Sequence, residues 1–134
     1  MGAPIPVGAG PYGIDVTPDG KYAYVANSGD STVSIIDTST NAVMGAPITV
    51  GTTPRGLAIS PDGQSVYVVN EGSMDVSVVD VNTNTVVQTF GGLGSAPFGV
   101  VFSPDGSRAY FTIINDGTIA FVDTASKAVL ANVP

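Results

Sequence analysis

The sequence predicts an all-β protein made of three equal units, each a four-stranded blade of a β-propeller. A Pro-x-Gly triplet, a Pro-Asp-Gly triplet, a tyrosine and an aspartate each recur at a spacing of 43 residues, with no insertion between copies. Turn signals recur about every 8–12 residues, and no segment has a helical period. The equivalent positions are 11–13, 54–56 and 97–99; 18–20, 61–63 and 104–106; Tyr24, Tyr67 and Tyr110; Asp37, Asp80 and Asp123.

The first complete unit contains four apolar stretches separated by turns. The Pro-Asp-Gly triplet at 18–20 predicts a tight hairpin turn, because proline presets φ and glycine accepts a positive φ. The stretch at 22–26 is β-branched and aromatic without alternation, which indicates a strand covered on both faces. The predicted strands are 13–16, 22–26, 32–36 and 42–44.

The second and third units repeat this order of strands. Their predicted strands are 57–59, 65–69, 76–79 and 85–89, then 100–102, 109–113, 119–122 and 128–130. The chain is therefore interpreted as a single three-blade segment over 1–134, with repeats at about 7–49, 50–92 and 93–134. Residues 1–5 repeat the sequence at 44–48, and residues 1–6 are assigned to the outer strand or linker of a preceding blade. The alternative is a β-sandwich of similar size, but a sandwich has no reason to keep a fixed 43-residue period.

Composition limits the chemistry and the partners of the chain. Hydrophobic residues make up 43% and charged residues 11%, against about 25% charged in ordinary domains, so much apolar surface must be buried. Eleven acids against four scattered bases leave no basic face for nucleic acid. There is no cysteine and no histidine. No apolar run reaches the roughly 18 residues that span a bilayer, and the N-terminus lacks the regions of a signal peptide.

The four motifs in their order resemble the YVTN-type β-propeller repeat of prokaryotic surface-layer and lactonase-like propellers. Residues 24–27 (YVAN) and 67–70 (YVVN) match the naming motif in three of four places, whereas 110–113 (YFTI) lacks the asparagine. The resemblance covers essentially the whole chain and implies a propeller fold. It also implies an extracellular or cell-surface location. It implies little about function, because such propellers serve many roles.

The repeated acids and tyrosines are predicted to be structural. A catalytic carboxylate pair is needed once per site, whereas a turn residue is needed once per blade, so the six repeated aspartates are assigned to turns. The repeated tyrosines are expected to wedge between blades, with each hydroxyl bonded to backbone. The remaining loop acids raise the alternative of calcium but lack the spacing of a calcium loop, and solvated charge is preferred. These loop acids are Asp30, Glu71, Asp75 and Asp116. No metal and no cofactor is predicted.

Positions that differ between the copies are the candidate binding residues. Tyr12, Arg55 and Phe98 occupy one equivalent position at the start of the inner strands, which in a propeller opens onto a mouth of the central channel. A mixed set of aromatic and cationic side chains suits a ligand. Asp15 is the one acid within a predicted inner strand and joins this candidate site. The structural alternative is free variation at exposed loop starts.

Three functions follow as hypotheses. The preferred one is a non-enzymatic binding or scaffold module that assembles with itself and takes a protein or small-molecule ligand at the channel mouth. The second is a lactonase-like enzyme with Arg55 and Asp15 at the channel. The third is an excised or engineered propeller fragment with no activity of its own. Three blades cannot encircle an axis, so we expect head-to-tail assembly into a six-bladed homodimer, with a nine-bladed homotrimer as the alternative.

Overall fold

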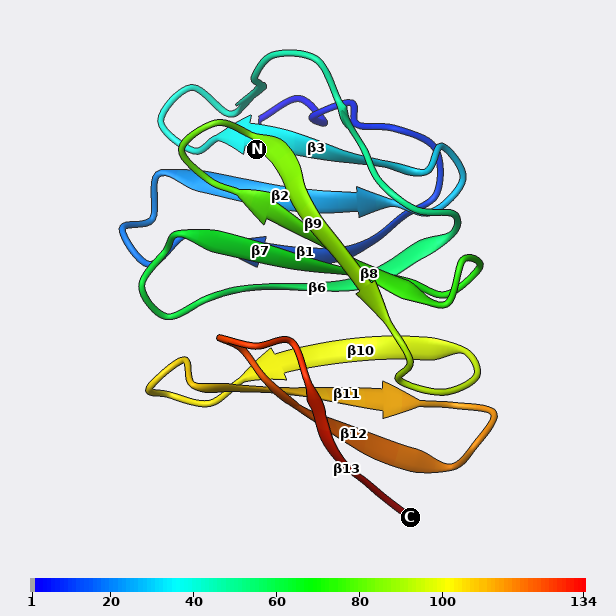
Figure 1. Cartoon of the computed structure of the whole chain (residues 1–134). Helices are drawn as coiled ribbons and strands as arrows, with labels where there is room; N and C mark the ends of the chain where they lie inside the picture. The colour runs from blue at the N-terminus through cyan, green and yellow to red at the C-terminus, as the bar shows by residue number, and fades with distance from the viewer. Residues whose placement is uncertain (1) are drawn as a thin grey trace.

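The computed structural model describes residues 2–134 and contains three antiparallel sheets that follow one another along the chain (Figure 1). Blade 1 contains β1 (Pro11–Val16), β2 (Tyr22–Asn27), β3 (Thr32–Asp37) and β4 (Ala42–Val43), and the short β5 (Ile48–Thr49) also pairs with β3. Blade 2 contains β6 (Pro54–Ile59), β7 (Ser65–Asn70), β8 (Asp75–Asp80) and β9 (Thr85–Gly91). Blade 3 contains β10 (Pro97–Phe102), β11 (Arg108–Ile113), β12 (Thr118–Asp123) and β13 (Val129–Val133). The prediction of three four-stranded blades is confirmed, and over these residues no helix is long and apolar enough to cross a membrane.

Each inner strand begins earlier than predicted, at the proline of its Pro-x-Gly triplet. In blade 1, Pro11 pairs with Asn27 and Ile14 pairs with Val25, so the inner strand has one extra residue at a β-bulge. Blades 2 and 3 repeat this irregularity at the same place. The triplet therefore belongs to the sheet, where the bulge re-aims the residue between proline and glycine.

The triplet glycines of blades 1 and 2, Gly13 and Gly56, lie where neighbouring inner strands touch. A Cβ atom added at Gly13 would lie 2.4 Å from the carbonyl oxygen of Arg55. One added at Gly56 would lie 2.5 Å from the carbonyl oxygen of Phe98. No side chain fits at such distances, so these glycines set how closely adjacent blades converge.

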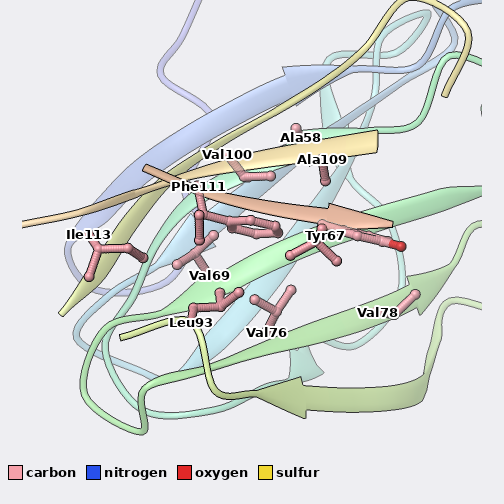
Figure 2. Packing of buried hydrophobic residues seen from close by; sticks show 12 residues of the cluster. Ala58, Tyr67, Val69, Val76, Val78, Leu93, Val100, Ala109, Phe111 and Ile113 are labelled. Atoms are coloured by element: carbon pink, nitrogen blue, oxygen red, sulfur yellow. The ribbon is translucent and has the colours of Figure 1, made fainter. Parts of the chain in front are cut away.

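Apolar side chains fill the two spaces between neighbouring blades. We call the sheet face that points to the following blade the forward face and the opposite one the back face. The layer between blades 1 and 2 includes Tyr24, Val33, Ile35, Leu57, Ile59, Val66 and Val68. The layer between blades 2 and 3 includes Tyr67, Val76, Val78, Val100, Phe111 and Val122 (Figure 2). The core is thus two interblade layers rather than one central core, as expected for units that share their cores.

The Pro-Asp-Gly turns have the predicted backbone geometry. Gly20, Gly63 and Gly106 have φ values of 74°, 72° and 73°, which glycine adopts without the strain of a Cβ atom. The aspartate of each triplet accepts hydrogen bonds within its own turn: Asp19 accepts from the Thr17 hydroxyl. The other two aspartates, and the second repeated set at the end of each third strand, accept turn hydrogen bonds in the same way. The assignment of all six aspartates to turns agrees with these contacts.

Residues 2–7 lie against blade 1 without forming a strand. Ile5 and Val7 pack on the back face of blade 1, against Ala23, Val25 and Ile36. One repeat later, Ile48 and Val50 take the corresponding place between blades 1 and 2. Met1 lies outside the described residues. The assignment of residues 1–6 to a preceding blade stays a prediction.

Candidate functional site

Three of the four candidate site residues come together where the inner strands begin. The guanidinium carbon of Arg55 lies 5.1 Å from the ring centroid of Tyr12 and 5.7 Å from that of Phe98. The two rings meet edge to face at 5.3 Å, although they belong to blades 1 and 3. The arginine therefore packs beside the touching pair of rings, in cation–π contact with both. We call Tyr12, Arg55 and Phe98 the inner cluster.

A fourth residue, Glu71, forms an ion pair with Arg55 of the inner cluster. Its Oε2 atom lies 2.6 Å from Nε of Arg55, and both side chains are partly buried. The interpretation of Glu71 as a solvated loop charge is therefore wrong. Glu71 follows β7, whose last residues pair with the start of β6, and this pairing brings the loop beside Arg55. This ion pair could not be predicted from the repeat, because the positions equivalent to Glu71 in the other loops carry no charge.

The other loop acids that were expected to be solvated also make specific contacts. Asp30 accepts a hydrogen bond from the backbone amide of Ala9 at 2.7 Å, and Asp116 accepts one from Ser95 at 2.9 Å. Asp75 accepts one from the side-chain amide of Asn70. Asp30 and Asp116 thus tie their loops to the chain segment that precedes the inner strand, whereas Asp75 bonds within its own hairpin.

Asp15 lies apart from the inner cluster in its contacts. Its Oδ2 atom accepts a hydrogen bond of 2.9 Å from the backbone amide of Ile59, on the inner strand of the next blade. Its Oδ1 atom accepts one of 2.8 Å from the adjacent amide of Val16. Both oxygens thus bond to backbone amides, and Asp15 serves the interface between blades 1 and 2. Its predicted role in ligand binding remains a prediction.

The asparagine of the naming motif has a buried role that the sequence did not specify. Asn27 is fully buried, and its Nδ2 group donates to the hydroxyl groups of Thr32 and Ser34. Asn70 repeats this with Asp75 and Ser77. In blade 3 the position is Ile113, which packs in the core beside Leu93. The motif therefore fixes the loop between the second and third strands, and an apolar contact replaces it in the third copy.

The tyrosines that were predicted to wedge between blades do so at two positions out of three. Tyr24 and Tyr67 are buried in the two interblade layers, whereas Tyr110 is half-buried on the forward face of blade 3, beside Phe121. The expected backbone partner is wrong for Tyr24, whose hydroxyl donates to Oδ1 of Asn84 at 2.7 Å. A side chain on the next blade provides this acceptor, and the sequence could not place it.

Three consecutive four-stranded antiparallel sheets with converging inner strands define the chain as a propeller segment. A family model described as "Lactonase, 7-bladed beta-propeller" matches residues 6–91, and the chain belongs to this family. None of the curated proteins compared with the chain matches it.

The chain is also similar to a solved structure, the hydrazine synthase of Kuenenia stuttgartiensis. The two share 32% sequence identity with a TM-score of 0.86. The match covers 92% of this chain and 36% of the other, so the chain spans about a third of that relative's length. This likeness supports the propeller fold.

Proposed function

We propose that the chain is a non-enzymatic binding or scaffold module that assembles with copies of itself into a closed propeller. The observation that carries this proposal is the exposure of its two end faces. On the forward face of blade 3, Val101 is 61% exposed and Ile119 is 44% exposed. Their equivalents one repeat earlier, Ala58 and Val76, are 8% and 0% exposed between blades 2 and 3. The same apolar positions that are buried within the chain thus face solvent at its end.

The back face of blade 1 has the matching property. Ile14 and Val16 are 62% and 46% exposed, whereas their equivalents Leu57 and Ile59 are buried between blades 1 and 2. Soluble monomers rarely leave contiguous apolar patches of this kind uncovered. When blade 1 of a second copy follows blade 3 of the first, one pair of end faces is covered by the same kind of contact that the chain already makes twice. Closing the ring covers the other pair.

The volumes of the two end faces are also complementary. Between blades 2 and 3, the large Phe111 stands on the back face and the small Val78 on the forward face. At the ends the sizes are exchanged: Phe121 replaces valine on the forward face of blade 3, and Val25 replaces phenylalanine on the back face of blade 1. The proposed junction and the layer between blades 2 and 3 thus each contain one aromatic ring at this pair of positions, so the junction matches that layer in volume. The layer between blades 1 and 2 has Ile35 and Val68 there instead.

A head-to-tail contact closes into a ring when the rotation per chain divides the circle. Two chains give six blades at about 60° each, and three chains give nine at about 40°, against about 51° for seven blades. The dimer departs less from the geometry named in the family description. We therefore propose a six-bladed homodimer, with the nine-bladed homotrimer as the second choice. A protein or small-molecule ligand would bind at the mouth of the ring, on the inner cluster of each copy.

The test compares two valines with nearly equal exposure. Val101 lies on the proposed contact face, and Val87 lies on β9, the outer strand of the middle blade, with an exposure of 60%. We expect Val101→Asp to convert the assembly to monomers, because a carboxylate would be buried without a partner. Val87→Asp should leave the assembly intact. If both variants keep the mass of the parent protein, assembly does not use the forward face of blade 3.

The alternative function is a lactonase-like enzyme, which the family description favours. Its candidate groups are Arg55 of the inner cluster, with Glu71 as counter-charge, and Asp15 on β1. Hydrolysis of a panel of lactones tests it. Turnover that disappears in Arg55→Ala and persists in Val87→Asp would support the enzyme and contradict a purely non-enzymatic role.

A further inference from the structure

The interface between blades 1 and 2 contains a polar contact inside an apolar layer. The buried hydroxyl of Tyr24 donates to Oδ1 of Asn84 at 2.7 Å. Burial raises the pKa of Tyr24 to about 12, which keeps this donor protonated. Asn84 stands in the turn between β8 and β9 with φ 53°, a left-handed conformation that asparagine tolerates better than most residues.

The next interface uses the same two positions with another residue type. Lys127, one repeat after Asn84, has φ 60° in the turn between β12 and β13. Its Nζ atom lies 5.5 Å from the ring centroid of Tyr67, the equivalent of Tyr24. At both interfaces within the chain, the tyrosine on the forward face thus meets the left-handed turn residue of the following blade.

The third tyrosine and the third turn residue have no such contact within the chain. Tyr110 lies half-buried on the forward face of blade 3, and Asn41 lies exposed in the turn between β3 and β4 with φ 53°. Across residues 2–134 neither side chain makes a hydrogen bond. We propose that the hydroxyl of Tyr110 in one copy donates to Oδ1 of Asn41 in the next, forming a polar latch at each junction between chains. This inference rests on the self-assembly proposed above.

The hydrogen bond of the latch fixes the relative orientation of two neighbouring chains, which contact between apolar faces alone does not. Apolar area attracts any apolar partner, whereas a buried hydroxyl and amide are satisfied only in one register. A contact between two forward faces would leave Asn41, which lies on blade 1, outside the junction. The tyrosine–asparagine pair therefore selects the head-to-tail arrangement, which closes a ring, over a symmetric pairing of end faces.

The experiment measures the dissociation constant of the assembly by dilution for Tyr110→Phe, Asn41→Gly and the double variant. Glycine removes the amide while accepting the positive φ of this turn. Each single variant should weaken each junction about fivefold, and so weaken a dimer with two junctions about 25-fold. The double variant should be no weaker than either single one. Asn41→Asp keeps an acceptor oxygen and should retain most of the affinity.

Tyr24→Phe is the matched control, because it removes the same kind of contact inside one chain. It should lower the melting temperature and leave the dissociation constant nearly unchanged. If the parent protein assembles and both latch variants match it in affinity, the latch is wrong and self-assembly stands. If the parent protein is a monomer at every concentration, self-assembly fails and the latch fails with it.

Discussion

The carboxylate of Asp15 accepts a hydrogen bond from the backbone amide of Ile59, 2.9 Å away across the interface between blades 1 and 2. The equivalent positions in blades 2 and 3 are Ala58 and Val101, which offer no such acceptor. Asp15 differs from the residues at the equivalent positions and is a candidate for ligand binding in the channel. In the structure it makes a contact between blades. Variation within a repeat frame marks interface chemistry as readily as it marks a ligand site.

Replacement of Asp15 by alanine should lower the free energy of unfolding by about 1–2 kcal/mol, because the buried amide of Ile59 loses its acceptor. Asp15→Asn keeps an oxygen in place and should lower it less. Urea denaturation at one fixed protein concentration measures both. Equal stability of Asp15→Ala and the parent protein would show that the contact contributes nothing.

Gly56→Ala should be among the most damaging small substitutions, with a loss of about 2–4 kcal/mol, because the added methyl group would meet the carbonyl oxygen of Phe98 at 2.5 Å. Gly2→Ala is the control, since nothing lies within 4 Å of a Cβ atom there. Thermal unfolding of the two variants side by side gives the comparison. Similar melting temperatures would mean that the inner strands can separate without cost.

Acid should destabilise the protein through its turn aspartates. Hydrogen bonds, first from the Ser103 hydroxyl and then from Ser107, lower the pKa of Asp105 to about 2. The Thr17 and Ser39 hydroxyl groups likewise lower the pKa values of Asp19 and Asp37. These folded-state values lie below the ordinary 3.8, so the unfolded chain binds more protons in acid. Their stabilisation is present above the ordinary value and is lost as the pH falls through the folded-state values.

We therefore expect a melting temperature that is constant between about pH 6 and 8, where the chain has no histidine to titrate, and that falls between about pH 4 and 2. Asp105→Asn should show a smaller decrease over the same acid range, because one of the titrating groups is gone. A melting temperature that stays flat down to about pH 2 would contradict the assignment of these aspartates to stabilising turns.

Most of the fold could be predicted from the sequence, because each strand and turn is indicated by a similar pattern in all three repeats. The strands lie within a few residues of their predicted places, and the positive φ of Gly63 follows from the Pro-Asp-Gly order alone. The short strand β5 and the bulge after Pro11 were missed. Both depend on pairing with a neighbouring strand, which local sequence patterns do not reveal.

The candidate site could be predicted only in part. The repeat frame identified Tyr12, Arg55 and Phe98 as equivalent, and the structure brings them into contact. Their partner Glu71 could not be predicted, because the equivalent positions in the other two loops carry no charge. Asn84, the acceptor for Tyr24, lies 60 residues from it, and only the packing of one blade on the next places the two together.

The mass of the protein in solution tests the central claim of self-assembly most directly. One chain has a mass of 13.4 kDa, so light scattering at micromolar concentration should give about 27 kDa for the six-bladed dimer. A mass of about 40 kDa would keep head-to-tail closure and replace the dimer with the nine-bladed trimer. A mass of 13.4 kDa would contradict the account, because the apolar end faces of blades 1 and 3 would then stand uncovered in water.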